Sequence, residues 1–554
     1  MLCPDMDRRA FLVASASAAA LGASPMGCSA SRSAAEAVSG AASPASPPGT
    51  PHPELEEATL ADLAARMARG ETSAAELCRG YLARIDALDR HGPAIRAVID
   101  VNPDAIALAE GLDAERRAGR VRGPLHGIPV VVKDNLDTGD RMETTAGSLA
   151  LAGTRAHADA HVVARLRAAG AVLLGKTNLS EWANIRASKS TSGWSGRGGL
   201  TRNPYALDRN TSGSSSGSAA AVTANLCAAA IGTETDGSIV SPSSICGIVG
   251  FKPTVGLWSR AGIVPISRTQ DTAGPMARSV ADAAVLLAAV AGSDPRDPAT
   301  AAQPARPADA YLKALDPGGA KGLRVGVVRA FPDIAKPVMS IFDAAVEDLR
   351  RLGAVVIDPV DLGPMAKIGD PELVVLLTEL KAGMAEYLAT RGPEVAARTL
   401  EDLVKWNTAH ASEELRWFGQ DLFEQAVAKG ALDAPAYTEA LAACRRYSRD
   451  EGIDAALRTH QLDVLVAPTG GPAWITDLVN GDAFTGSSST PAAVAGYPSI
   501  TVPAGAMHGL PIGISFFAGA WAEPTLLRIA YAYEQATKRR IRPRMLATID
   551  DGAG

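Results

Sequence analysis

The stretch Asn210-Thr-Ser-Gly-Ser-Ser-Ser-Gly-Ser218 is followed by an alanine-rich run and then by Gly232-Thr-Glu-Thr-Asp-Gly-Ser-Ile-Val240. Residues 212–218 contain only serine and glycine, so they have no apolar face to bury and are expected to form a loop. The small side chains of residues 219–230 predict a helix that packs closely on all sides and ends at Gly232. A turn of small residues follows at 236–238. One buried helix is therefore expected to hold two serine-bearing loops at a fixed separation.

A flexible Gly/Ser linker followed by a core helix is the alternative interpretation of this stretch. Linkers of this composition behave as flexible coils that join separate parts of a chain. They do not run directly into a buried helix, as this stretch does. The composition therefore favours a rigid scaffold for functional groups over a tether.

The stretch resembles the signature of the amidase signature family, in which a loop of glycines and serines precedes Gly-Thr-Asp-x-Gly-Gly-Ser-Ile by the same spacing. The resemblance covers roughly residues 55–540 and includes three further motifs: Gly175-Lys-Thr-Asn178, Gly250-Phe-Lys-Pro-Thr254 and Asp271-Thr-Ala-Gly-Pro-Met276. It implies one large α/β domain over residues 55–545, with a mixed, mainly parallel β-sheet flanked by helices. It also implies an amidase that needs no cofactor and no metal.

The resemblance assigns three catalytic residues. Ser238 would be the nucleophile, Ser214 the bridging serine, and Lys133, which ends the run Val130-Val-Val-Lys133, the base. Lysine has an ordinary pKa near 10.4, so burial must depress the pKa of Lys133 before its amine can accept a proton. Pairing of Lys133 with Asp134 at the surface is the alternative role. In the family the bridging serine follows a cis peptide bond, which falls here between Gly213 and Ser214.

The expected oxyanion hole consists of backbone N–H groups that bind the charge developing on the attacked carbonyl oxygen. The resemblance places these groups on the turn before the nucleophile, on Thr235, Asp236, Gly237 and Ser238. Two residues depart from the family pattern: Asp236 replaces the first of two glycines, and Val240 replaces an arginine. A carboxylate pointing at the oxyanion would disfavour it. The Asp236 side chain is therefore expected to point away and to hydrogen-bond elsewhere.

The sequence of residues 178–184, Trp194 and residues 236–240 is most similar to bacterial peptide amidases, which remove the C-terminal amide from peptides. The expected partner is therefore a small peptide amide or amino-acid amide, hydrolysed to a carboxylate and ammonia. Other small or aryl amides are the alternative substrates. Trp182 and Trp194 are candidates for lining the substrate cleft, and packing in the core is the alternative for both.

Three other functions fit part of the sequence. Residues 213–217 match the Gly-x-Ser-x-Gly elbow of α/β-hydrolases with Ser215 as nucleophile, but the preceding residues 205–210 are too polar for the strand that this elbow needs. The amidotransferase that modifies misacylated tRNA contains a component with the same family core, but it works in the cytoplasm with partner subunits. A binding protein without activity would not need the three catalytic residues together.

The charge and cysteine content argue against several classes of protein. The chain has 554 residues, with 54 basic and 60 acidic side chains and a net charge of −6. Acidic side chains outnumber basic ones, so the overall charge does not indicate nucleic-acid binding. The six cysteines show no regular spacing and no Cys-x-x-Cys motif. They therefore indicate neither a structural metal nor a dense disulfide framework.

The N-terminal residues predict export. The segment Asp7-Arg-Arg-Ala-Phe-Leu12 precedes a weakly apolar run at 13–21, which is typical of a twin-arginine signal peptide over residues 1–30. The run is too short to span a bilayer, so a periplasmic location is expected. Cleavage near Cys28 is expected, and lipid attachment to this cysteine is the alternative. Residues 31–54 predict a disordered tether rich in Ala, Ser and Pro.

Capping patterns and apolar runs predict the remaining elements. Thr59 and Ser73 begin capping boxes, so helices are expected to about Arg69 and about Leu88. A β-α-β pattern over residues 323–357 predicts parallel pairing. The other predicted strands are 130–132, 171–174, 464–468, 499–505 and 511–515, and the other predicted helices are 103–118, 159–169, 279–291 and 523–537.

Overall fold

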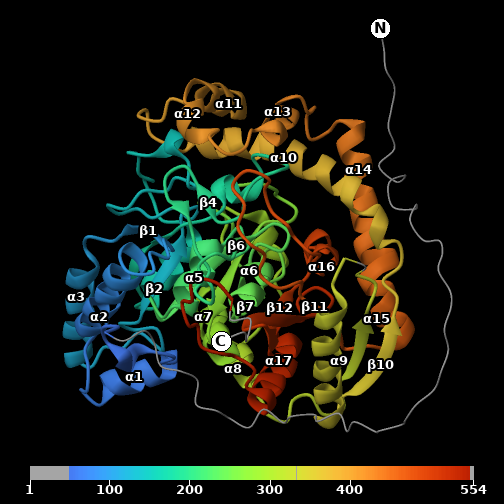
Figure 1. The fold of residues 1–554 in the computed structure, drawn as a ribbon, viewed down its shortest axis with the longest axis horizontal. Coiled ribbons are helices and arrows are strands. Elements are labelled where there is room, and N and C mark those ends of the chain that lie inside the picture. Colours follow the sequence, from blue (N-terminus) through green and yellow to red (C-terminus); the bar gives the residue numbers. More distant parts are fainter. Residues whose placement is uncertain (1–48, 308, 332, 550–554) are drawn as a thin grey trace, which may run out of the picture. The chain divides into compact units, whose positions relative to one another are not determined.

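The computed structural model describes residues 49–307, 309–331 and 333–549, which belong to one compact unit. Its centre is an eleven-stranded sheet in the order β1-β3-β2-β6-β8-β7-β12-β13-β11-β9-β10 (Figure 1). The strands are β1 (Val98–Val101), β2 (Pro129–Lys133), β3 (Val172–Thr177), β6 (Ala229–Glu234), β7 (Val249–Lys252), β8 (Thr272–Ala277), β9 (Arg324–Val328), β10 (Val355–Val360), β11 (Val464–Pro468), β12 (Ser499–Met507) and β13 (Leu510–Phe517). Strands β4 (Trp194–Ser195) and β5 (Gly199–Leu200) form a separate two-stranded sheet.

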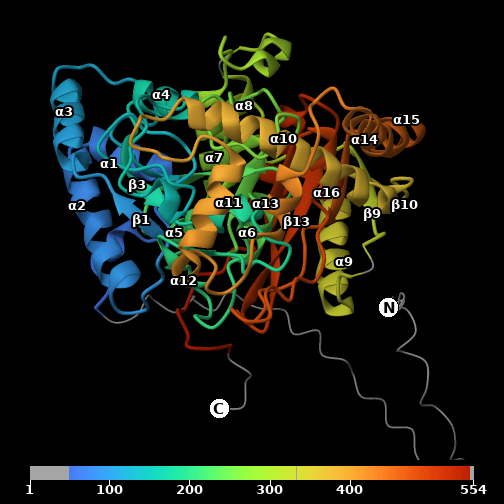
Figure 2. The same ribbon diagram turned by 90° about the horizontal axis from the view of Figure 1, so that it is seen from above.

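Helices pack on the sheet as two groups. Helices α7 and α9 both contact α17, and all three contact central strands, while α5 and α6 form a second contacting pair on central strands. Helices α1–α3 lie at one end of the sheet, and α9 lies beside β9 and β10 at the other end (Figure 2). The helices are α1 (Leu60–Ala68), α2 (Ala74–Arg84), α3 (Ala105–Arg117), α4 (His161–Ala168), α5 (Ser216–Thr223), α6 (Val240–Ile245), α7 (Val280–Val290), α8 (Ala310–Lys313), α9 (Lys336–Arg351), α10 (Gly369–Ala389), α11 (Leu400–Ala409), α12 (Ala411–Glu414), α13 (Asp421–Val427), α14 (Pro435–Arg445), α15 (Asp454–His460), α16 (Thr490–Ala495) and α17 (Glu523–Thr537).

The sheet is mixed, as expected, but it is not mainly parallel. Parallel pairing is confined to β2 with β3 and β6, and to β9 with β10 and β11. The six other neighbouring pairs in this eleven-stranded sheet are antiparallel. The sequence patterns did not predict β1, β7 or β8. Glycine and proline interrupt β8, so it lacks the β-branched pattern by which strands are recognised.

The alanine-rich run is a helix only in its first half. Helix α5 ends at Thr223, Asn225 adopts a left-handed φ of 55°, and residues 229–234 form β6 between β2 and β8. Small apolar side chains suit a buried helix and a central strand equally, so composition did not separate the two. Gly232, the expected helix stop, lies inside β6, where a Cβ would meet Ser215 Oγ at 2.8 Å. A helix and a strand therefore connect the two serine-bearing loops.

Residues on both sides of the predicted domain make contacts with it. The predicted signal peptide and most of the predicted tether lie outside the described residues. Pro53–Leu55 form a short helical turn, and Arg84 Nη1 donates hydrogen bonds to the carbonyl oxygens of Pro51 and His52. Thr548 donates a hydrogen bond to Asp208 at 2.6 Å. Residues 51, 52 and 548, outside the predicted range 55–545, therefore also make contacts with the domain. None of the helices described here is long and apolar enough to cross a membrane.

Candidate active site

Three segments bring the predicted catalytic residues to one edge of the sheet. Lys133 is the last residue of β2, Ser238 follows β6, and Ser214 lies in the loop before α5. Strands β2 and β6 are parallel neighbours, so their carboxyl ends meet at the same edge. The Gly213–Ser214 peptide bond is cis, as the resemblance implied. Residues from distant parts of the sequence thus become neighbours.

Lys133 is fully buried and surrounded by oxygen atoms. Its Nζ lies 2.7 Å from Ser214 Oγ and 3.2 Å from Ser215 Oγ. It also lies 2.8 Å from Thr233 Oγ1 and 3.3 Å from the carbonyl oxygen of Thr233. Burial lowers the pKa of Lys133 to about 7, and the carboxylates of Asp271 and Glu234 oppose this shift. The side chain can therefore accept a proton near neutral pH.

The two neighbouring serines of the loop differ in their contacts. Ser215 Oγ donates to the carbonyl oxygen of Thr233 at 3.0 Å and accepts from the N–H of Thr233 at 3.1 Å. The Ser215 hydroxyl therefore both donates a hydrogen bond to the backbone of β6 and accepts one from it. Ser215 does not line the cavity beside the site, whereas Ser238 does. The geometry thus disfavours Ser215 as a nucleophile.

The turn at residues 235–238 presents free backbone donors. Within the described part of the chain, none of its four N–H groups donates a hydrogen bond to another protein group. Gly237 has a φ of 78°, and a Cβ there would meet Ser489 Oγ at 2.9 Å, so only glycine fits without strain. The turn can therefore offer its N–H groups to a substrate oxygen.

The side chain of Asp236 points away from these donors, as expected. Its two carboxylate oxygens accept hydrogen bonds from Ser489 Oγ at 2.5 Å and from Thr490 Oγ1 at 2.7 Å. Burial raises the pKa of Asp236, and the two hydroxyl groups oppose this shift. Asp236 therefore attaches the turn to the N-terminal end of α16.

Four further polar residues, Glu234, Gln270, Asp271 and Glu372, hold the same turn, and the sequence analysis gave these four no role. Thr235 Oγ1 donates to Asp271 at 2.6 Å, and Glu234 accepts the backbone N–H groups that follow Ser238, at 2.7 and 3.0 Å. Gln270 Nε2 donates to Glu372 at 2.8 Å and contacts the carbonyl oxygen of Thr235 at 3.4 Å. Asp271 lies in the motif at residues 271–276, so the sequence contained a signal for this residue. No sequence motif pointed to Glu372.

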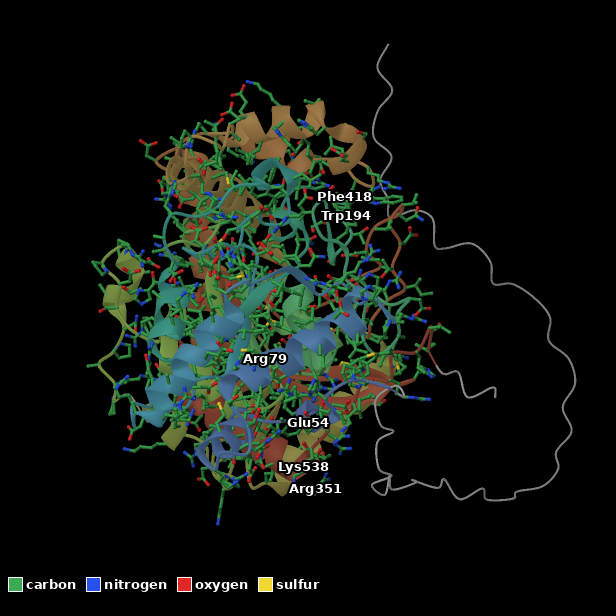
Figure 3. The ribbon with its side chains drawn as sticks, turned by 90° about the vertical axis from the view of Figure 1, so that its left-hand side faces the viewer. Glu54, Arg79, Trp194, Arg351, Phe418 and Lys538 are labelled. Atoms are coloured by element: carbon green, nitrogen blue, oxygen red, sulfur yellow. The ribbon has the colours of Figure 1, made fainter. Side chains whose placement is uncertain are left out.

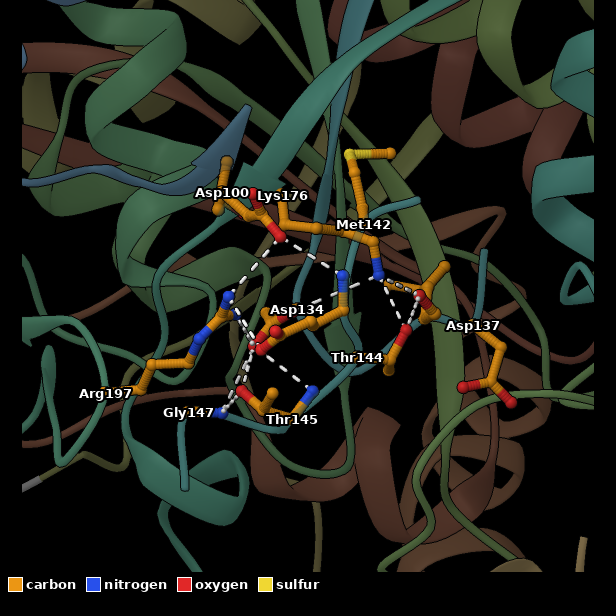
Figure 4. A network of polar contacts seen from close by, with 12 residues as sticks. Asp100, Asp134, Asp137, Met142, Thr144, Thr145, Gly147, Lys176 and Arg197 are labelled. Carbon is orange, nitrogen blue, oxygen red and sulfur yellow. Dashed lines mark hydrogen bonds and ion pairs between the residues drawn. The ribbon is translucent and has the colours of Figure 1, made fainter. Parts of the chain in front are cut away.

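A polar network anchors the end of β2 just after Lys133 (Figure 4). The carboxylate of Asp134 accepts a hydrogen bond from Thr145 Oγ1, and it lies 3.6 Å from Arg197 Nη1 and 4.0 Å from Lys176 Nζ. Lys176 Nζ also donates to the carbonyl oxygen of Leu136 at 2.7 Å. Asp134 therefore pairs with these cations inside the protein, and the alternative of a surface pair with Lys133 does not hold.

A cavity of about 360 Å³ opens beside Ser238. Its lining includes Asp236, Trp474, Asp482 and Phe484. The serine-bearing turn is thus accessible from a cavity with both apolar and acidic walls.

Within residues 49–307, 309–331 and 333–549, no group of three or more His, Cys, Asp or Glu side chains is placed to hold a metal ion.

Trp182 and Trp194, the candidates for the substrate cleft, do not line the cavity beside Ser238. Both side chains are buried. Trp182 packs on Phe423 with ring centroids 5.8 Å apart, and Trp194 packs edge-on against Phe418 at 5.2 Å (Figure 3). Aromatic rings with such partners contribute to the core. Trp474 lines the cavity instead, and its position far along the chain gave no sequence signal.

Known proteins share this fold and much of this sequence. Residues 76–527 match the Amidase family. The chain is 54% identical to a peptide amidase from Stenotrophomonas maltophilia, whose crystal structure superposes with a TM-score of 0.85 over 88% of this chain and 99% of that chain. It is 41% identical to a probable amidase of Arabidopsis thaliana over 89% of this chain and 92% of that protein. A glutamyl-tRNA(Gln) amidotransferase component from Chloroflexus aurantiacus is 36% identical, over 89% of this chain and 99% of that protein.

The fold, the buried lysine beside two serines and these similarities define an enzyme that hydrolyses amides. The chain belongs to the amidase signature family.

Proposed function

We propose that the enzyme hydrolyses the C-terminal amide of peptides or amino-acid amides through a Ser238-Ser214-Lys133 triad and releases ammonia. The observation that carries the proposal is the buried 2.7 Å contact between Lys133 Nζ and Ser214 Oγ, in a site where Ser238 lines the cavity. A solved peptide amidase in complex with the competitive inhibitor chymostatin is 54% identical, with a TM-score of 0.86 over 89% of this chain and 100% of that chain. This similarity supports a peptide as substrate.

In the proposed acylation step, neutral Lys133 accepts the hydroxyl proton of Ser214 while Ser214 accepts that of Ser238. Ser238 Oγ then forms a bond to the amide carbon, and the carbonyl oxygen becomes an oxyanion held by the N–H groups of residues 235–238. As the C–N bond breaks, the proton returns through Ser214 to the leaving nitrogen. The products of this step are ammonia and an ester on Ser238.

Deacylation repeats the relay with water. Water gives a proton to Lys133 through Ser214, and its oxygen attacks the ester carbon. The bond to Ser238 Oγ breaks, and Ser238 regains its proton by the same route. The sum is one amide and one water converted to one carboxylic acid and one ammonia. The three side chains return to their starting states.

The first prediction concerns pH. Burial depresses the pKa of Lys133 to about 7, and the proposed base acts in its neutral form. kcat/KM for a neutral peptide amide should therefore rise as pH increases through about 7. The measurement is initial-rate ammonia release between about pH 5 and 9, with circular dichroism at each pH as the control for folding. A rate that is flat over this range in a folded enzyme would contradict the proposal.

The second prediction concerns the position of the cleaved bond. A leaving –NH₂ group is small, so the site needs room for a chain on only one side of the carbonyl. A peptide ending in –CONH₂ should be hydrolysed at least about 100-fold faster than the same peptide extended by one residue, because a misplaced carbonyl loses about this factor. Mass spectrometry identifies the products, and the Ser238→Ala variant controls for contaminating peptidases. If the enzyme cleaves the internal bond, or if it hydrolyses only fatty and aryl amides, its substrates belong to another class.

A tRNA-dependent amidotransferase component is the second candidate because of the 36% identity to such a protein. The higher identity to the peptide amidase favours hydrolysis of a free amide. Purified protein that releases ammonia from peptide amides without any partner protein would support the first candidate. Activity that appears only with added partner proteins and tRNA would support the second.

We also propose that the protein is exported by the twin-arginine pathway to the periplasm, from the Arg8-Arg9 pair before the apolar run at 13–21. Cleavage near Cys28 and lipid attachment to Cys28 give mature N-termini of different mass. Mass spectrometry of protein purified from cell fractions distinguishes them. A cytoplasmic protein with an intact N-terminus would contradict export.

A further inference from the structure

One wall of the active-site cavity comes from residues 474–484, a segment for which the proposed reaction has no use. Trp474 and Phe484 both line the cavity that contains Ser238. Their rings meet edge to face, with centroids 5.6 Å apart. Trp474 is buried, whereas the side chain of Phe484 is 49% exposed. An aromatic surface therefore begins inside the cavity and continues to its mouth.

The same segment exposes two further large apolar side chains. Ile475 is 59% exposed and Val479 is 77% exposed. Single exposed apolar residues are ordinary on protein surfaces. Here three exposed apolar side chains fall within residues 475–484, and one of them, Phe484, lines the catalytic cavity, which indicates a binding surface.

Hydrogen bonds hold the segment in place before any substrate arrives. The carboxylate of Asp482 accepts from Trp474 Nε1 at 3.3 Å and from Ser192 Oγ at 2.5 Å. The carbonyl oxygen of Trp474 accepts from the N–H of Asn210 at 2.8 Å, just before the serine-rich loop. The aromatic wall is thus fixed relative to the loop that carries Ser214. A preformed surface loses little conformational entropy when it binds a ligand.

The charge of the cavity further restricts which side chains a ligand can place in it. Its lining includes two acidic residues, Asp236 and Asp482, and within the described residues it includes no lysine, arginine or histidine. An acidic side chain in the cavity would lose its hydrating water and would have no cationic side chain as a partner. The cavity is therefore suited to apolar side chains and unsuited to acidic ones.

We propose that residues 474–484 form the substrate-recognition wall, which binds a bulky apolar side chain within the last two residues of the peptide amide and disfavours an acidic one. The inference rests on the proposed function and specifies its substrate class. Because the leaving group is only –NH₂, a wall that runs outward to the surface contacts the peptide side of the carbonyl. Among the apolar residues of this wall that line the cavity, Phe484 is the exposed one, so it is open to a ligand.

The test measures kcat/KM on a matched set of peptide amides. The last and the penultimate residue are varied in turn among Phe, Leu, Ala and Glu. Phe or Leu should exceed Ala by about 10-fold or more at one of the two positions, which is the discrimination that apolar pockets reach, and Glu should fall below Ala. In the Phe484→Ala variant the Phe-to-Ala ratio should fall toward one. Phe484→Leu keeps an apolar side chain and should retain most of the preference.

Val355→Ala is the matched control, because Val355 is also a half-exposed apolar residue (46% exposed) but lies on β10 at the far edge of the sheet. It should leave the ratios unchanged, and thermal unfolding should show that all variants are folded. Equal kcat/KM for all peptide amides, or ratios that Phe484→Ala leaves unchanged, would overturn the inference while leaving the proposed function intact. No activity on any peptide amide, together with activity on other amides, would instead refute the proposed function.

Discussion

Replacement of Ser238 by alanine should lower kcat for a peptide amide by about five to six orders of magnitude, as in other hydrolases that lose their serine nucleophile. The loss is this large because no covalent intermediate can form. The Ser238 hydroxyl makes no hydrogen bond to another described residue, so the free energy of unfolding should change little. Ammonia release and thermal unfolding are the two measurements.

A fluorophosphonate label separates Ser238 from the neighbouring candidate. Peptide mapping by mass spectrometry should place the adduct on Ser238 in the wild-type enzyme and in the Ser215→Ala variant, and nowhere in Ser238→Ala. Ser215 is the matched control because its hydroxyl also lies near Lys133, at 3.2 Å, yet is occupied by β6. An adduct on Ser215 with Ser238 unmodified would favour the hydrolase elbow.

Replacement of Lys133 by methionine should lower kcat by about 100- to 10,000-fold, the range that general-base catalysis contributes. Methionine is similar in length and apolar, so the buried site should stay filled. The variant should therefore fold, and single-turnover acylation should be the step that slows. A variant that keeps more than about a tenth of the wild-type kcat, a loss of under about 1.4 kcal/mol, would make a central base role for Lys133 untenable.

Lys176→Met is the matched control for the removal of a buried lysine. Lys176 is also fully buried and lies on the adjacent strand β3, but it contacts Asp134, Leu136 and Thr144 rather than Ser214. Its loss leaves the buried carboxylate of Asp134 with one cation fewer. The free energy of unfolding should therefore fall by up to about 3–5 kcal/mol, the usual cost of breaking a buried ion pair. The folded fraction should retain far more activity than Lys133→Met.

Short-range features of the chain were predictable from the sequence alone. The apolar run that ends at Lys133 predicted a buried strand, the capping patterns at Thr59 and Ser73 predicted the starts of α1 and α2, and residues 523–537 form α17 as expected. These features depend on the preferences of neighbouring residues. The conformation of the serine-rich loop likewise depends on the residues of the loop itself. The family resemblance therefore identified the candidate catalytic residues from the sequence alone.

Only the tertiary structure decided which partners these residues meet. Asp236 bonds to Ser489, 253 residues away in the sequence, and the aromatic wall of the cavity is built from residues 474–484 rather than from Trp182 and Trp194. The alanine-rich run divides into α5 and β6 because β6 pairs with β2 and β8, contacts that local composition does not encode. Pairing and burial depend on surfaces contributed by distant parts of the chain, so they are determined only when the chain folds.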